Sequence, residues 1–159
     1  MGIFRSKKMK IDNKIIESLI KARILRYKQA DKETIKTLLS SSERIYNFIK
    51  SLEINENSSD IIFRELYEAI RQLGEARWRL LSYEPLNHEI SLDGISDLEI
   101  KHKIYLNHLP RFKKIRNDLN YRGIKIEVSQ AKEIFEFWKN CGEEILEILK
   151  KETYNNSNS

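Results

Sequence analysis

Apolar residues recur every three or four positions along most of the chain, which is the spacing of amphipathic α-helices. A first helix is predicted over about residues 13–28. A second is predicted from Asp31, which can cap its N-terminus, to about Leu52, and a third begins at Ser59 or Asp60. The second helix has the clearest apolar stripe, which consists of Ile35, Leu38, Leu39, Ser42, Ile45, Tyr46, Ile49 and Leu52.

Two prolines divide the middle of the chain. Pro85 ends the third helix, and a short helix or turn is predicted over residues 88–95. Ser96 can open a further helix, which would have to break or kink between Asn107 and Pro110, because proline clashes with the preceding turn inside a helix.

Two more helices complete the predicted structure. One covers about residues 110–121 and is followed by Gly123, the residue type that most easily adopts a left-handed C-cap. After an extended connector at residues 124–128, Ser129 can cap the last helix. Its expected buried face is formed by Ile134, Trp138, Cys141, Ile145, Leu146 and Leu149.

These patterns predict an all-α fold, an up-and-down antiparallel bundle of about five to six helices, because no strand-like alternation stands out and the connections are short. We expect one domain over residues 1–159 with an ordered core at about 12–152. The basic segment 1–10 and the polar tail 153–159 are expected to be flexible. Gly74 costs helix stability, so we expect a close helix–helix approach there.

Composition narrows the function classes. No run approaches the roughly 20 apolar residues of a membrane span, and no apolar segment follows the basic start as in a secretory signal. The single cysteine, Cys141, excludes an internal disulfide and is expected to pack as a small apolar residue. We therefore predict a cytoplasmic protein with no cofactor, no metal and no membrane contact.

The placement of charge changes this picture. Residues 101–125 hold eight lysines and arginines against one acid, Asp118, and the first ten residues add four bases without an acid. One interpretation is a solvated helix face; the other is a surface that binds a polyanion such as nucleic acid. The second would involve Lys113, Lys114 and Arg122.

The stretch from Phe112 to Lys125 concentrates the candidate chemistry. Arg116 offers a planar set of donors that suits phosphate oxygens, and Asn117 can orient it or bind the same ligand. The alternative is that Arg116 pairs with Asp118 or with a neighbouring helix and only stabilises the bundle. Tyr121 follows one turn later, near the predicted end of the helix.

This stretch resembles the signature of the HEPN superfamily, in which an arginine and a polar residue precede a histidine by a few positions. Two upstream runs, residues 67–70 (Tyr-Glu-Ala-Ile) and 87–89 (Asn-His-Glu), resemble segments common in HEPN helices. The resemblance spans roughly residues 14–149. It implies a HEPN-like bundle, RNA or nucleotide binding, and a homodimer that brings two copies of Arg116 together.

One position departs from that signature, since Tyr121 stands where the family has histidine. The resemblance implies metal-independent RNA cleavage with Arg116, Asn117 and Tyr121 as catalytic candidates, but phenols ionise near pH 10 and exchange protons poorly at neutral pH. Tyr121 can still donate to phosphate, stack on a base, or simply pack in the core. Three residues could supply a base instead: His88, His102 and His108.

Two hypotheses remain. The first is an RNA- or nucleotide-binding protein, extending to ribonuclease activity in a toxin–antitoxin or stress-defence system. The second is a non-catalytic HEPN interaction module that binds a partner protein such as a nucleotidyltransferase. The charge around Arg116 favours the first, and Tyr121 favours the second.

Overall fold

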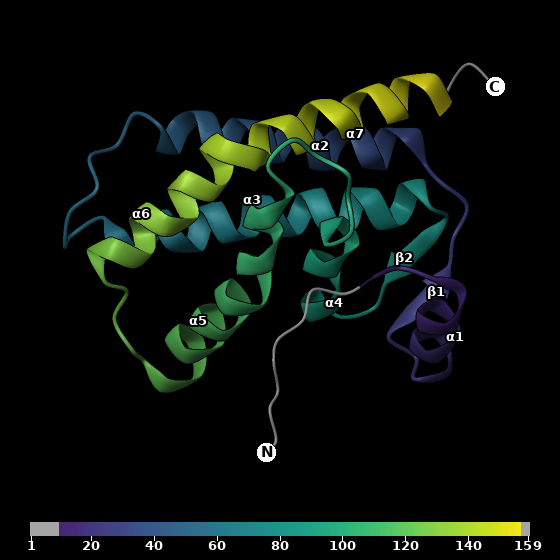
Figure 1. The fold of residues 1–159 in the computed structure, drawn as a ribbon, viewed down its shortest axis with the longest axis horizontal. Coiled ribbons are helices and arrows are strands. Elements are labelled where there is room, and N and C mark those ends of the chain that lie inside the picture. The colour runs from purple at the N-terminus through teal and green to yellow at the C-terminus, as the bar shows by residue number, and fades with distance from the viewer. Residues whose placement is uncertain (1–9, 157–159) are drawn as a thin grey trace.

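A computed structural model describes residues 10–156 and confirms the predicted all-α helical bundle. Its long axis is formed by α2 (Lys32–Ile49), α3 (Ser59–Leu80) and α7 (Glu143–Asn156), which lie side by side (Figure 1). The predicted start of α2 is correct, because the Asp31 carboxylate accepts a hydrogen bond from the backbone N–H of Glu33.

The bundle is built around α3, which is buried along most of its length. Its apolar side contacts α2, α6 (Val128–Phe137) and α7. The short α4 (His88–Leu92) and the motif helix α5 (Leu109–Arg122), which carries Arg116, pack against it further along. The completely buried residues of α3 include Ile62, Phe63, Leu66, Ala69, Ile70, Leu73 and Ala76. A helix surrounded in this way is a rigid base for side chains that it presents to solvent.

The motif helix α5 (Leu109–Arg122) has nearly the predicted bounds. Pro110 lies in its first turn, and Gly123 ends it with a φ of 65°, as a left-handed C-cap requires. The next helix, α6 (Val128–Phe137), is capped by Glu127 and Gln130 rather than by Ser129. It continues through a π-helical turn at Trp138–Gly142 into α7, so the expected last helix is α6 and α7 together, with its predicted face buried.

The first predicted helix is too long. α1 covers only Asn13–Lys21, because Arg23 adopts a φ of 60° and the N–H groups of Arg23 and Ile24 return to the carbonyls of Ile20 and Leu19. This is a Schellman ending built on arginine instead of glycine, so the sequence gives no sign of it.

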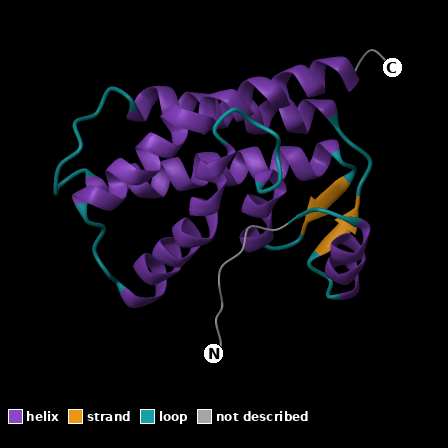
Figure 2. Cartoon of the chain, in the orientation of Figure 1, coloured by secondary structure: helices purple, strands orange, loops and turns teal. Residues whose placement is uncertain are grey.

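A small sheet follows that ending and corrects the expectation of a strand-free chain. Strand β1 (Leu25–Tyr27) pairs antiparallel with β2 (Tyr83–Pro85), and the two lie beside α1 at one end of the bundle (Figure 2). Each strand has only three residues, which is too short for period-two alternation to stand out from a sequence.

The helix expected from Ser96 to Asn107 is also wrong. The chain has α4 (His88–Leu92), then short 3₁₀ turns at Asp93–Ile95 and Lys103–His108, with an irregular segment between these turns. Leu98 and Ile100 are buried there, and the N–H of Lys101 donates to the Glu144 carboxylate of α7 at 3.0 Å. A tertiary hydrogen bond thus replaces a helical one.

The close approach predicted at Gly74 exists, but its partner is the α4 segment. A Cβ atom on Gly74 would lie 1.9 Å from the Ser91 carbonyl oxygen, and one on Gly94 would lie 2.1 Å from the Gly74 carbonyl oxygen. Two glycines therefore let the backbone around α4 lie directly on α3, and this contact sets the position of His88 and Glu89.

The C-terminal end of the described part differs from the expected flexible tail. α7 continues to Asn156, so residues 153–156 are helical rather than a loose tail. Residues 1–9, which include most of the basic N-terminal segment, and residues 157–159 lie outside the described part. Within that part, none of the helices combines the length and apolar character needed to cross a membrane.

Candidate functional site

Three segments that are far apart in the sequence meet at one surface pocket of about 280 Å³. They are the same three segments that carry the HEPN resemblance. The lining residues are Tyr67, Glu68 and Arg71 from α3, His88 and Glu89 from α4, and Arg116, Asn117, Asn120 and Tyr121 from α5.

Arg116 is half-buried at the wall of this pocket, with its guanidinium carbon 5.7 Å from the centre of the Tyr67 ring. Burial raises the pKa of Tyr67 to about 12, although the Arg116 charge acts in the opposite direction. The phenol therefore stays neutral at physiological pH and offers Arg116 a ring face rather than a negative charge. No acceptor among the described residues forms a hydrogen bond or ion pair with Arg116, so the alternative of a pairing with Asp118 is not found there.

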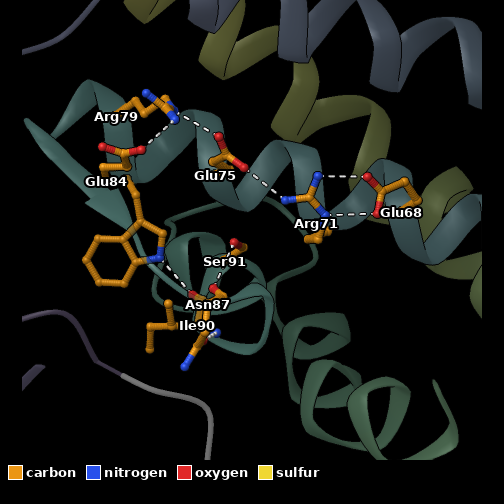
Figure 3. A network of polar contacts seen from close by, with 9 residues as sticks. Glu68, Arg71, Glu75, Arg79, Glu84, Asn87, Ile90 and Ser91 are labelled. Carbon is orange, nitrogen blue, oxygen red and sulfur yellow. Dashed lines mark hydrogen bonds and ion pairs between the residues drawn. The ribbon is translucent and has the colours of Figure 1, made fainter. Parts of the chain in front are cut away.

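Arg71, by contrast, is fully engaged. Its guanidinium donates to both carboxylate oxygens of Glu68 at 2.7 and 2.9 Å and to Glu75 at 2.9 Å. Glu75 also accepts from Arg79, which contacts Glu84, so opposite charges alternate along α3 as far as β2 (Figure 3). Glu68 and Glu75 therefore pair with arginines of their own helix, and the charge of Arg71 is neutralised before any ligand arrives.

The two α4 side chains approach the pocket from the other side. Asn87 caps α4, its side-chain oxygen accepting from the N–H of Ile90 at 3.0 Å, which places His88 and Glu89 in the first turn. The Asn117 amide donates weakly to Glu89 at 3.4 Å and so links α5 to this carboxylate. His88 and Glu89 are both exposed, so a ligand in the pocket can reach them.

Tyr121 is not a packed aromatic residue. Its side chain is 84% exposed at the last turn of α5, beside the equally accessible Asn120. Of the roles considered for Tyr121, core packing is therefore wrong, and those that need an accessible ring or hydroxyl remain.

The basic patch of residues 101–125 is half neutralised by carboxylates. Lys113 lies 2.6 Å from Asp93 and is only 23% exposed, so it is not the free lysine we expected to face nucleic acid. Lys114 is 79% exposed and has a weak contact with Asp118, while Arg122 is exposed and unpaired within the described residues. Lys103 and Arg111 are also paired, which leaves Lys101, Arg116, Arg122 and Lys125 without an ion pair there.

The other two histidines lie away from the pocket. His108 stacks between Tyr105 and Phe112, and its Nδ1 lies 3.0 Å from Glu133. His102 is exposed beside the Tyr105 ring. Only His88 of the three lines the candidate site, and the described residues contain no cluster of three His, Cys, Asp or Glu side chains arranged to hold a metal ion.

Sequence reasoning missed two lining residues, Arg71 and Asn120. Each lies one helical turn after a residue that the motifs did identify, Arg71 after Tyr67 and Asn120 after Arg116. The i,i+4 spacing could have found them, because such residues share a helix face.

The pocket combines groups that bind different parts of one polar ligand. Arg116 can donate to an anion, the asparagines can donate and accept, and the exposed Tyr121 ring can stack on a flat group.

Comparisons with protein-family models, curated proteins and solved structures found no match to this chain. The HEPN resemblance thus rests on these residues alone.

Proposed function

We propose that this protein is a HEPN-type protein that binds RNA or a nucleotide through a phosphate contact of Arg116. The observation that carries the proposal is the state of that side chain. Arg116 is half-buried, its guanidinium has no acidic partner among the described residues, and it lines a pocket with hydrogen-bonding and aromatic groups. A partly desolvated cation without an acceptor is costly, and a phosphate group would supply both charge and acceptors.

The size and lining of the pocket support a nucleotide unit. A volume of about 280 Å³ is near the lower end of small-molecule sites, which begin at roughly 300 Å³. The neutralised pair of Glu68 and Arg71 adds little net charge, so Arg116 is the main attraction for phosphate. Asn117, Asn120 and Tyr121 supply the contacts that a base or sugar needs.

Binding can be measured with a fluorescein-labelled, mixed-sequence single-stranded RNA by fluorescence anisotropy. Arg116→Ala should weaken binding by ~1.5–3 kcal/mol, roughly ten- to a hundredfold. Arg44→Ala is the matched control, because Arg44 is exposed on α2 and lines no part of this pocket. Absence of saturable wild-type binding, or equal effects of the two variants, would overturn the proposal.

The second candidate is a non-catalytic interaction module that pairs with a protein such as a nucleotidyltransferase. What supports it is Tyr121, an exposed aromatic residue at the position where the signature has histidine, since exposed aromatic residues are enriched at protein interfaces. This candidate gains if the wild type neither binds nor cuts RNA and Tyr121→His creates no activity. A complex with a nucleotidyltransferase from the same genome, weakened by Tyr121→Ala in size-exclusion chromatography, would then be expected.

A further inference from the structure

We propose that His88 and Glu89, two neighbours on α4, carry out the proton transfers of RNA cleavage in this pocket, in place of a histidine on α5. This inference rests on the proposed RNA binding through Arg116 and adds to it the reaction and the residues that perform it. It follows from where the described histidines and carboxylates lie.

His88 is the acid because of its location. Imidazole is the side chain that exchanges protons most readily near neutral pH, and of the three histidines only His88 lines the pocket with Arg116 and Tyr121. His108 is stacked between two aromatic rings and bound to Glu133, so it cannot turn toward a ligand at Arg116 without losing those contacts.

Glu89 is the base because it is the less occupied of the two carboxylates in the pocket. Glu68 is held by Arg71 through two short hydrogen bonds, so both of its carboxylate oxygens are already occupied. Glu89 has one long contact, 3.4 Å to the Asn117 amide, and is exposed. Glu89 lines the same pocket as Arg116 and Tyr67.

The reaction is an internal transesterification. The Glu89 carboxylate takes the proton of a ribose 2′-hydroxyl while the 2′-oxygen forms a bond to the adjacent phosphorus. The bond from phosphorus to the 5′-oxygen breaks, and His88 in its imidazolium form gives its proton to that oxygen. The products are a 2′,3′-cyclic phosphate end and a 5′-hydroxyl end, with Glu89 protonated and His88 neutral, and exchange with water restores both.

Arg116 and Tyr121 have a different part in this scheme. The guanidinium donates to the non-bridging phosphate oxygens, whose negative charge grows as the fifth bond to phosphorus forms. The exposed Tyr121 hydroxyl can donate to the same oxygens without changing its protonation state. A tyrosine at this position is therefore compatible with cleavage, because no proton transfer is required of it.

The test uses the full chain with a labelled mixed-sequence single-stranded RNA in the presence of EDTA, together with its all-2′-deoxy counterpart. We expect cleavage of the RNA alone, with cyclic phosphate and 5′-hydroxyl ends identified by mass spectrometry. Arg116→Ala protein, purified in parallel, should be inactive, which excludes a contaminating ribonuclease. Binding is measured separately on the deoxy strand, which cannot be cut.

His88→Ala should lower the single-turnover cleavage rate about a hundredfold or more, whereas His102→Ala, an exposed histidine outside the pocket, should leave it unchanged. The pH profile separates the two roles. A reaction that needs one general base and one general acid has a bell-shaped pH profile, so Glu89→Gln should remove the acidic limb and His88→Ala the alkaline one. The other charged groups facing this pair, Glu68 and Arg71 from α3 and Arg116 from α5, are unchanged in both variants.

The outcomes distinguish this inference from the function on which it rests. If the wild type fails to bind either strand, the proposed function and this inference both fall. Arg116-dependent binding without cleavage overturns the inference alone. So do cleavage of the deoxy strand, equal rates for His88→Ala and His102→Ala, or pH limbs that survive both substitutions.

Discussion

The Arg116 guanidinium carbon lies 5.7 Å from the centre of the Tyr67 ring, and within the described residues no carboxylate pairs with it. A cation over an aromatic face is worth about 0.5–1 kcal/mol where solvent reaches it and more when it is desolvated. The contact fixes the direction of Arg116 while leaving its N–H donors free for a ligand. An acidic partner would have fixed it equally well but would have used those donors.

Replacement of Tyr67 should therefore weaken RNA binding although Tyr67 is not charged. Tyr67→Leu removes the ring, and we expect a loss of about 1 kcal/mol, roughly fivefold in affinity, in the anisotropy assay. Tyr67→Phe is the control because it keeps the ring and should bind like the wild type. Equal losses for the two variants would show that the hydroxyl rather than the ring supports Arg116.

The ion pairs of the basic patch predict which cations contribute to salt dependence. Each phosphate contact on a single strand lowers the slope of log affinity against log salt by about 0.7. Arg122→Ala should make the slope shallower by about that amount, because Arg122 is exposed and unpaired within the described residues. Lys113→Ala should leave the slope unchanged, since that lysine is paired with Asp93. If Lys113→Ala changed the salt slope more than Arg122→Ala did, the pairing of Lys113 with Asp93 would not explain the salt dependence.

The sequence predicted the bundle and the motif helix well because both depend on local signals. The apolar stripe of α2, Pro110 in the first turn of α5 and Gly123 after its last are readable without tertiary structure. The C-terminal end of α1 and the irregular segment after α4 were not predictable from local signals. Arg23 adopts a conformation more typical of glycine, and Lys101 gives its N–H to Glu144 on another helix.

Gly74 provides a test of how the α4 segment is held. Gly74→Ala would put a methyl group 1.9 Å from the Ser91 carbonyl oxygen, and backbone must move to relieve the clash. We expect a loss of about 3 kcal/mol or more in the free energy of unfolding, measured with urea. Because α4 carries His88 and Glu89, Gly74→Ala protein that still folds should cleave RNA more slowly than the wild type while its affinity for RNA is kept.

Gly123→Ala is the matched control for this experiment. Gly123 has a φ of 65°, and a Cβ there would meet no atom within 4 Å. The cost is then only that of a left-handed alanine, about 1 kcal/mol. If Gly123→Ala proved as damaging as Gly74→Ala, the close packing of α4 on α3 would not be the cause.

The site was predictable in part for the same reason as the fold. The motif identified Arg116, Asn117 and Tyr121 as candidate site residues, and these three do line one pocket, together with residues of the two upstream runs. Which charged residues are paired was not predictable, because their partners come from other elements of the fold. Lys113 is neutralised by Asp93 from a 3₁₀ turn, and Arg116 is left without an acid.

A dimer that brings two copies of Arg116 together would also bring the two exposed Tyr121 side chains toward each other. We predict a homodimer above the 19.0 kDa mass of the chain in sedimentation at micromolar concentration. Tyr121→Glu should weaken it by placing two like charges close together across the interface, whereas Tyr27→Glu, at a 70% exposed tyrosine on β1, should not. A monomer at all concentrations, or a dimer sensitive only to Tyr27→Glu, would contradict this arrangement.

The alternating charges on α3 make stability depend on pH. Burial of Glu75 acts to raise the pKa of its carboxyl, but hydrogen bonds from Arg71 and Arg79 outweigh it, so this pKa lies below the ordinary value of 4.5. A carboxyl with a lowered pKa in the folded state stabilises that state fully above its ordinary pKa. The stabilisation is lost as the pH falls through the lowered value.

Glu75→Gln should therefore reduce the free energy of unfolding by about 1–3 kcal/mol at neutral pH, because charged hydrogen bonds to two arginines are weakened. The difference from the wild type should shrink as the pH falls below 4.5, where the wild-type carboxyl becomes protonated. Urea unfolding across this range measures both. Glu65→Gln, an exposed glutamate of the same helix, is the control and should change stability little at any pH. If the Glu75→Gln difference stayed constant into the acid range, the carboxylate charge would not be what connects Arg71 to Arg79.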